Sequence, residues 1–419
     1  MSKDGATRLF SFINIWEFNQ MERTYTYKFR LYPNKEQQEY LANVFGCCRF
    51  VYNYFLNEKK KQYKESKTSD SYYTQSSKLT KLRKIGDFNF LSAISLQSLQ
   101  CSLKNMHTAY ENFYRHRGKY PRFKSKKDKQ SFKIPQERCF KIENDKLYIP
   151  KLKSGINLVV SKKIFGKICF ATISKSKTNR YYISITVKQE YEPYVKTNRS
   201  VGLDLGIKDF VVTSDGFKYP SIKNKIKNLK RKLKHNQRHL SRKVHGSRRY
   251  ERQVLKCNRI YQKMTDIKTD YIHKITTELV RNYDLIKVED LNVKGMLKNH
   301  CLAESISECN WSQFVSTLEY KCKWNGKVLT KIDRFHPSSQ MCSACGYVER
   351  RVRNLNVREW TCCNCGCHHD RDVNAAKNIL NYNSARSAEH SRGVVGKPNE
   401  KLESDDCSDN RETTNLLNA

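Results

Sequence analysis

The chain has 419 residues, and its 80 Lys and Arg against 41 Asp and Glu give a formal net charge of +39 at pH 7. So large a positive charge opposes compact folding unless a polyanion neutralises it. Nucleic acid is therefore the expected partner, and an anionic membrane surface is the alternative. No apolar run approaches the ~18 residues of a membrane span, so we expect a folded, non-membrane protein of about two to four domains.

The N-terminus and the cysteines indicate the compartment. The apolar residues 9–16 are too short and too interrupted for a signal peptide, and no small-residue cleavage site follows them. Of the 16 cysteines, four stand at the spacing of a metal site, and most others, such as Cys101 and Cys322, lie singly in apolar surroundings. This usage favours a reducing, intracellular compartment.

The N-terminal half begins with a strand and a long helix. Residues 1–22 match no periodic pattern and are interpreted as an N-terminal extension, whereas residues 24–33 alternate as a strand does. From Asn34 the apolar period becomes helical, with Gln37 three positions after this cap. A second helical stretch is expected over about residues 91–114.

A basic segment with interleaved aromatic side chains follows at residues 120–127, and Arg122 and Lys124 are its candidate nucleic-acid contacts. Short runs of strand-forming residues come next. Together with the N-terminal strand they predict a small barrel or sheet. These runs are residues 147–149, 168–173 and 181–187.

The C-terminal half alternates strands and helices, which is typical of an α/β layer fold. Beyond about residue 383 the chain turns polar and acidic, and we expect that tail to be disordered. The expected elements are a strand over 201–207, a hairpin turn at 214–216, two helices within 222–281, a strand over 284–291, a helix over 311–324 and a strand over 327–334.

Residues 222–256 carry the densest positive charge. No acid interrupts the ten Lys and Arg residues between Lys223 and Lys243, so there is little intrahelical pairing to offset their repulsion. One interpretation is a solvated charged face. The other, which we favour, is a grip on nucleic-acid phosphates through counterion release. The candidate contacts are Lys230, Arg231, Lys232, Lys234, Arg248 and Arg249.

Two CxxC motifs predict a zinc site. Cys342 and Cys345 form the first, and Cys362 and Cys365 form the second about sixteen residues later. That spacing fits a closed tetrahedral zinc site, in which four thiolates leave no open position, so the zinc is expected to be structural. Cys363 and Cys367 are spare thiols, His368 or His369 is an alternative ligand, and a disulfide-linked or buried set is the competing interpretation.

Two acids stand on predicted strands. Asp204 lies within an apolar strand, where an isolated carboxylate loses hydration and is expected to be paired or metal-bound. The second strand carries Glu289 and Asp290, whose side chains point to opposite faces of a sheet. Glu289, nearer the interior of the strand, is our choice.

The third acid is either Asp370 or Asp372, directly behind the second CxxC motif. Asp372 precedes a helical pattern, so an ordinary helix N-cap is the alternative to a metal ligand there. Three acids on two strands and a helix start suit a site with two Mg²⁺ ions that hydrolyses phosphodiester bonds. Asp204 and Glu289 are therefore our choices on the strands, and Asp370 and Asp372 stay alternatives for the third acid.

Taken together, these residues resemble the TnpB family of transposon-encoded, RNA-guided nucleases, which are related to compact type V CRISPR effectors. The resemblance extends from about residue 22 to residue 380. The motifs that carry it are YKFRLYPN at 27–34, GCCRFVYN at 46–53, GLDLGIK at 202–208, VEDL at 288–291 and DRDVNAA at 370–376.

The resemblance implies a multidomain α+β protein that uses a transposon-end guide RNA to cleave double-stranded DNA beside a short, T-rich motif in the bacterial cytoplasm, at the nucleoid. It also assigns Asp204, Glu289 and Asp372 as the RuvC acids. The implied parts are an extension (1–22), a wedge-like β-barrel (23–33 and 120–199), a helical recognition domain (34–119), an RNase H-like RuvC domain (200–335 and 366–382), a zinc ribbon (336–365) and a disordered tail (383–419).

Three other functions compete with an RNA-guided nuclease. A nuclease-inactive, RNA-guided repressor is expected to lack one of the acids, and none is missing here. A transposase that acts without RNA shares the acids but does not co-purify with RNA. A zinc-ribbon nucleic-acid-binding protein without an active site leaves the spaced acids unexplained.

Overall fold

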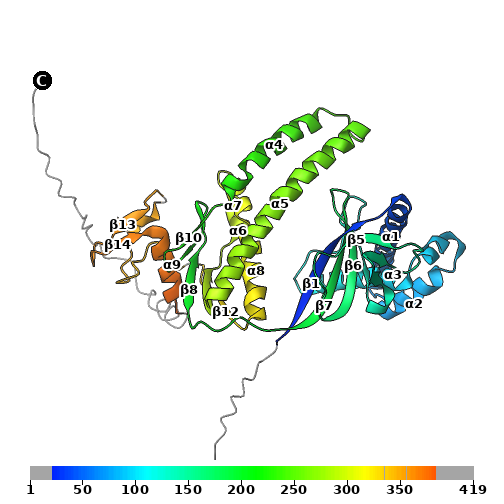
Figure 1. Ribbon diagram of the computed structural model, residues 1–419, viewed down its shortest axis with the longest axis horizontal. Coiled ribbons are helices and arrows are strands. Elements are labelled where there is room, and N and C mark those ends of the chain that lie inside the picture. Colours follow the sequence, from blue (N-terminus) through cyan, green and yellow to red (C-terminus); the bar gives the residue numbers. More distant parts are fainter. Residues whose placement is uncertain (1–20, 335, 355, 384–419) are drawn as a thin grey trace, which may run out of the picture. The chain divides into compact units, whose positions relative to one another are not determined.

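The computed structural model describes residues 21–334, 336–354 and 356–383 (Figure 1). Residues 1–20 of the predicted extension (1–22) and residues 384–419 of the predicted tail (383–419) lie outside the described residues, and the first strand begins at Met21, inside the predicted extension. The described chain forms two compact units, each of which has its own sheet and core.

The first unit, which extends to Glu192 and includes Lys232–Lys263, is built on a seven-stranded antiparallel sheet. Alternation along its first strand buries Tyr27, Phe29 and Leu31 on one face, as predicted. Across the sheet the strands are β2 (Gln130–Ile134), β6 (Lys167–Lys175), β7 (Tyr181–Tyr191), β1 (Met21–Tyr32), β5 (Ile156–Val159), β4 (Lys146–Tyr148) and β3 (Lys141–Glu143).

This sheet is open. The edge strands β2 and β3 do not pair with each other, so the predicted small barrel or sheet is a half-barrel. β3 and β4, at one end of this sheet, have three residues each.

A helical insert separates β1 from β2. Its first helix begins at the predicted capping box, where Oδ1 of Asn34 accepts from the Gln37 N–H at 2.8 Å and Oε1 of Gln37 accepts from the Asn34 N–H at 3.0 Å. The insert comprises α1 (Lys35–Ser66), α2 (Tyr72–Leu82), the 3₁₀ helix η1 (Gly86–Ala93) and α3 (Leu96–Tyr114).

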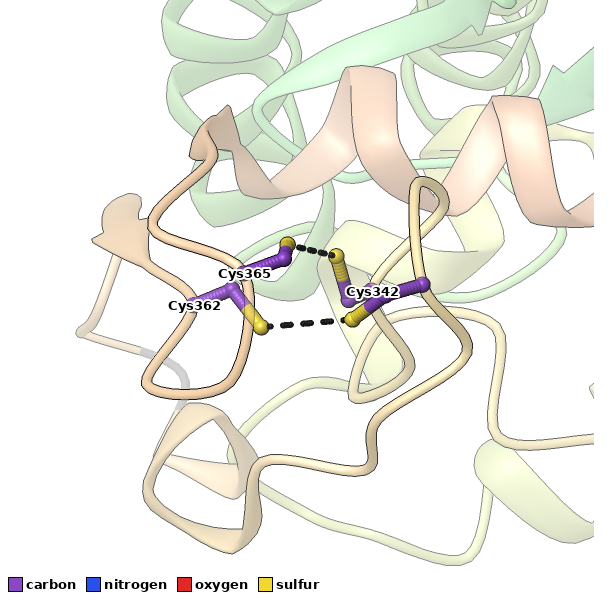
Figure 2. A group of neighbouring side chains, drawn as sticks. Cys342, Cys362 and Cys365 are labelled. Atoms are coloured by element: carbon purple, nitrogen blue, oxygen red, sulfur yellow. Dashed lines mark hydrogen bonds between the residues drawn. The ribbon is translucent and has the colours of Figure 1, made fainter.

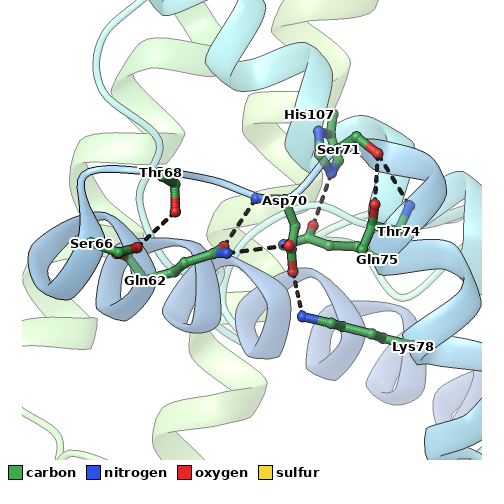
Figure 3. Close-up of polar contacts among 9 residues, drawn as sticks. All are labelled: Gln62, Ser66, Thr68, Asp70, Ser71, Thr74, Gln75, Lys78 and His107. Carbon is green, nitrogen blue, oxygen red and sulfur yellow. Dashed lines mark hydrogen bonds and ion pairs between the residues drawn. The ribbon is translucent and has the colours of Figure 1, made fainter.

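Polar contacts fix the corner between α1 and α2 (Figure 3). The side chain of Gln62 accepts a hydrogen bond from the Asp70 N–H at 2.9 Å, and the Asp70 carboxylate pairs with Lys78 at 2.5 Å. On α3, His107 lies 2.9 Å from the Gln75 amide oxygen. Burial lowers the pKa of His107 to about 4, so its ring is neutral at pH 7. The corner is therefore held by an ion pair and by side-chain hydrogen bonds.

The second unit, which contains Pro193–Arg231 and continues from Met264, is built on a five-stranded mixed sheet. Three neighbouring strands are parallel, and β9 is antiparallel to the strands on both of its sides. The consecutive residues Val201, Gly202 and Leu203 are all buried, as expected for a strand covered on both faces. In order, the strands are β10 (Lys218–Pro220), β9 (Asp209–Thr213), β8 (Ser200–Asp204), β11 (Leu285–Glu289) and β12 (Val328–Ile332).

The two predicted basic helices form a hairpin in which the Gln253 side chain donates to the carbonyl and side-chain oxygens of Asn236 at 3.0 and 2.9 Å. Within the described ranges, no helix has the length and apolar character that crossing a membrane requires. The helices in this half of the sequence are α4 (Lys223–Ser241), α5 (Arg248–Asn282), α6 (Val293–Met296), α7 (Ala303–Cys309), α8 (Trp311–Trp324) and α9 (Arg371–Asn381).

Candidate functional site

Two of the predicted acids end neighbouring parallel strands. Leu203 of β8 is level with Val288 of β11, so the next residues, Asp204 and Glu289, lie at the same edge of the sheet. Burial, together with the negative charges of Glu289 and Asp372, holds the pKa of Asp204 well above its ordinary value. The structure therefore places Asp204 and Glu289 side by side and Asp372 near enough for its charge to act on Asp204.

Asp290, the alternative to Glu289, has a different partner. Its carboxylate pairs with Arg334 at 2.5 Å, as expected when successive side chains point to opposite faces. The carboxylate of Glu289 accepts a hydrogen bond from the Ser338 hydroxyl at 2.5 Å. Burial raises the pKa of Glu289 even though this hydrogen bond acts in the opposite direction.

The start of α9 separates the roles of Asp370 and Asp372. Asp370 is the N-cap, and its Oδ1 accepts from the backbone N–H groups of Asp372 and Val373 at 3.0 and 3.1 Å. Burial raises the pKa of Asp370, but its ion pair with Lys218 at 2.5 Å and these N–H bonds outweigh burial and hold it below the ordinary value. Asp372 is therefore not the cap and lies in the first turn of α9, and its negative charge, like that of Asp370, contributes to raising the pKa of Asp204.

Helix α9, which carries Asp372, packs closely against the sheet (Figure 1). A Cβ atom at Gly202 would collide with the carbonyl oxygen of Ala376 in α9 and would lie 2.6 Å from the backbone nitrogen of Leu380. Lys287, level with Gly202 on β11, donates to the carbonyl oxygens of Leu380 and Tyr382 at 2.8 and 2.7 Å. The absence of a side chain at Gly202 thus lets α9 pack closely against the strand, and Lys287 caps the C-terminus of the helix.

The donor set fits Mg²⁺, a hard cation that prefers carboxylate oxygens. The one ion pair of Asp372 that the structure describes is with Arg358, at 3.7 Å. Among three mutually repelling carboxylates, a divalent cation would offset the repulsion that raises the pKa of Asp204.

The four predicted cysteines also converge. Their sulfur atoms all lie within 4.8 Å of one another, with Cys342 and Cys365 at 3.6 Å and Cys345 and Cys362 at 3.6 Å (Figure 2). Four thiolates placed ~2.3 Å from a tetrahedral zinc would be about 3.8 Å apart. The cluster therefore has the dimensions of a closed zinc site.

Each CxxC motif, which forms a cysteine knuckle, is followed directly by a glycine. Gly346 and Gly366 have φ angles of +80° and +70°, and their N–H groups donate at 2.9 Å to the carbonyl oxygens of Cys342 and Cys362. The CxxCG pattern, repeated twice, is a signal for these turns that the spacing argument alone did not use. The second knuckle lies between β13 (Glu359–Thr361) and β14 (His368–Asp370).

Two of the alternative ligands have contacts of their own. The Cys363 thiol contacts the Glu349 carboxylate at 3.2 Å and the Arg351 guanidinium at 2.9 Å. His369 lies beside the cluster, with Nε2 at 3.0 Å from the sulfur of Cys342. Among the described residues, the set of ligand atoms that all lie within 4.8 Å of one another contains the four cysteines and not His369.

The basic candidates do not form a single class. Lys230 pairs with Glu304 of α7 at 2.6 Å and also pairs with Glu308, so the expectation of an unpaired basic face does not hold for it. Sequence spacing did not reveal these partners because they lie more than 70 residues away. Four other candidates have exposed side chains that form no ion pair in the described part of the chain, namely Lys232, Lys234, Arg248 and Arg249.

The remaining candidates are partly engaged within the protein. Arg231 donates to the Asn228 side chain, and Arg122 lies 3.7 Å from Asp128 with its side chain 86% exposed. The Lys124 ammonium lies 3.8 Å from the centre of the Tyr52 ring. Arg122 is therefore the freer of the two contacts predicted in the segment 120–127.

Family models match most of the described chain. A family described as "Probable transposase" matches residues 182–300, and one described as "Cas12f1-like, TNB domain" matches residues 311–379. A third, described as "Helix-turn-helix domain", matches residues 21–68, which here form β1 and the single helix α1.

Two relatives show the family. A Streptomyces pristinaespiralis protein named "Putative RNA-guided DNA endonuclease" is 37% identical over 86% of this chain and 90% of its own length. An Escherichia coli K12 protein named "Putative RNA-guided DNA endonuclease InsQ" is 32% identical over 86% of this chain and 92% of its own length. The chain belongs to the TnpB family.

A solved structure shares the fold. The cryo-EM structure described as the "Cas12f1-sgRNA-target DNA complex" matches with a TM-score of 0.54 and 13% identity, over 86% of this chain and 99% of the other. At that identity the match shows a common fold alone.

The cysteine cluster predicts about one zinc ion per chain in the purified protein. Cys342→Ser and Cys362→Ser should each lose that zinc and unfold at a lower temperature, because metal binding is coupled to local folding. Cys363→Ser is the matched control and should keep it. Elemental analysis with thermal unfolding tests this, and normal zinc in Cys362→Ser but not in Cys363→Ser would shift the ligand assignment by one residue.

Proposed function

We propose that this protein is an RNA-guided DNA endonuclease whose active site is the carboxylate cluster. The observation that carries the proposal is the placement of Asp204 and Glu289 at one edge of the sheet. Burial, together with the charges of Glu289 and Asp372, raises the pKa of Asp204 and leaves a site that a divalent cation would stabilise. The names of the two relatives, which span nearly the whole chain, support the same activity.

The mixed sheet supports an RNase H-like RuvC nuclease domain. Its order β10-β9-β8-β11-β12, with β9 antiparallel, puts two of the acids on adjacent central strands and the third on the helix that covers them. The cysteine cluster, inserted between β12 and α9, is then the zinc ribbon. The half-barrel and its helical insert are the wedge and recognition parts, which would read a short, T-rich motif beside the target.

Asp204, Glu289 and Asp372 would hold two Mg²⁺ ions. The bound ions would supply an activated water and neutralise the leaving oxygen of the cleaved phosphodiester. The role of the protein is to hold the three carboxylates in position. Asp370 and Lys218 hold the first turn of α9, and Lys287 holds its last.

Guide RNA and target DNA are the proposed partners. The solved structure with the same fold is described as a complex with sgRNA and target DNA, and the net charge of +39 suits a protein that surrounds two polyanions. In such complexes base pairing selects the sequence, while Lys and Arg side chains hold the backbones. A cytoplasmic location beside bacterial DNA follows from this proposal.

A transposase that acts without RNA is the second candidate, favoured by the family description matched at residues 182–300. The two proposals differ in whether a defined RNA co-purifies with the protein. A nuclease-inactive repressor is disfavoured, because all three acids are present and adjacent.

The catalytic assignment predicts that Asp204→Ala, Glu289→Ala and Asp372→Ala each lower target cleavage by roughly a thousandfold or more, because each removes charge that holds the metal ions. Guide-dependent DNA binding should persist. Asp290→Ala and Asp370→Ala are the controls and should still cut, although loss of the N-cap in Asp370→Ala should cost about 1 kcal/mol of stability. Normal cleavage by Asp372→Ala, with none by Asp370→Ala, would reverse the choice.

The basic hairpin predicts a contrast between two sets of lysines. Replacing Lys232 and Lys234 by Gln should weaken RNA retention and reduce the slope of log affinity against log salt by about two, one for each phosphate that is no longer neutralised. Lys230→Gln should change thermal stability more than that slope, because Lys230 is paired with Glu304 and Glu308. A salt titration of RNA binding measures this slope. An unchanged slope in the double variant would mean that the charged face of α4 is solvated and does not contact RNA phosphates.

A further inference from the structure

Ser338 lies in the connection between β12 and the first cysteine knuckle, and it is buried, with 6% of its surface exposed. Its hydroxyl donates to Oε1 of Glu289 at 2.5 Å. Within the described residues, this is the single hydrogen bond that the carboxylate accepts. The contact involves Oε1, so Oε2 remains available to another ligand.

The backbone around Ser338 is fixed to α9. The carbonyl oxygen of Ser338 accepts a hydrogen bond from the Asn378 amide at 2.7 Å. The carbonyl oxygen of Met341 accepts bonds from Asn374 at 2.7 Å and from Asn378 at 2.5 Å. Both asparagines are buried, so these bonds satisfy groups that have no access to water. Asn374 is two residues after Asp372 on the same helix.

The first cysteine knuckle continues this attachment. Cys342 follows Met341 directly, and the backbone N–H of Ser343 donates to Oδ1 of Asn374 at 2.9 Å. One short segment therefore contacts Glu289 through the hydroxyl of Ser338, α9 through two carbonyl oxygens, and the zinc ligands through the chain itself.

We propose that Ser338 is a positioning residue for the nuclease reaction, orienting Glu289 through its hydroxyl and aligning α9, with Asp372, through its carbonyl oxygen. The inference rests on the proposed function, since it requires that the acid cluster binds divalent cations. A glutamate side chain with one oxygen already held loses less conformational freedom when a metal binds. Hydrogen-bond partners behind a metal ligand typically change metal affinity about 10- to 100-fold.

Ser338→Ala removes the hydroxyl and keeps the carbonyl, Ser338→Thr keeps both, and Ser339→Ala is the matched control, since its side chain forms no hydrogen bond within the described residues. Mn²⁺ binding to the full-length protein with its RNA is measured by calorimetry, and Asp204→Ala defines the signal from the acid cluster. We expect Ser338→Ala to weaken that binding roughly tenfold or more. The Mn²⁺ affinity of Ser338→Thr should be closer to that of wild type, and the affinity of Ser339→Ala should equal that of wild type.

A merely structural role for Ser338 gives a different result. Ser338→Ala would then unfold at a lower temperature but would bind Mn²⁺ as tightly as wild type, and that outcome overturns the inference. If Asp204→Ala also binds Mn²⁺ like wild type, the proposed function fails instead. Should Ser338→Ala not fold, Ser338→Cys, with a weakly donating thiol of similar size, decides the question by the same Mn²⁺ measurement.

Discussion

The packing of α9 against β8 and β11 is the constraint on which the rest of the second unit depends. It brings three carboxylates to one edge of the sheet, and their mutual repulsion opposes that packing. The structure offsets the repulsion locally. Gly202 permits the close approach, Lys287 caps the end of the helix, and the ion pair of Lys218 with Asp370 holds its beginning.

The cysteine cluster belongs to the same arrangement. The segment that carries it leaves β12, contacts Glu289 and the buried amides of α9, and returns through β14 directly into the first turn of that helix. Arg371, at the start of α9, also donates to the carbonyl oxygens of Asn354 and Val357 at 3.0 and 3.4 Å. Loss of zinc from the cysteine cluster would therefore disturb the position of Asp372, because hydrogen bonds connect the cluster segment to α9.

Local patterns predicted much of this from the sequence. The capping box at Asn34 and the helix over 311–324 depend on spacing within a few residues, and the structure agrees with both. The choice of Glu289 over Asp290 rests on the same kind of local pattern and stays a prediction, although Asp290 has a separate ion pair with Arg334. Contacts between distant residues could not be predicted in that way. The ion pairs of Lys230, the role of Asp370 as the N-cap and the hydrogen bond from Ser338 to Glu289 depend on how the elements pack.

The central claim is that the three acids form a divalent-metal site held together against their own charge. Thermal unfolding of wild type and Asp204→Asn, in buffer without added Mg²⁺ or with Mg²⁺, tests it most directly. A carboxyl with a raised folded-state pKa gives stability that is complete below its ordinary pKa and lost as pH rises through the raised value. Without Mg²⁺ at pH 7, Asp204→Asn should therefore unfold at a higher temperature than wild type, with the difference shrinking toward pH 4, and Mg²⁺ should stabilise wild type more. Equal stability without Mg²⁺ and an equal response to Mg²⁺ would contradict the account.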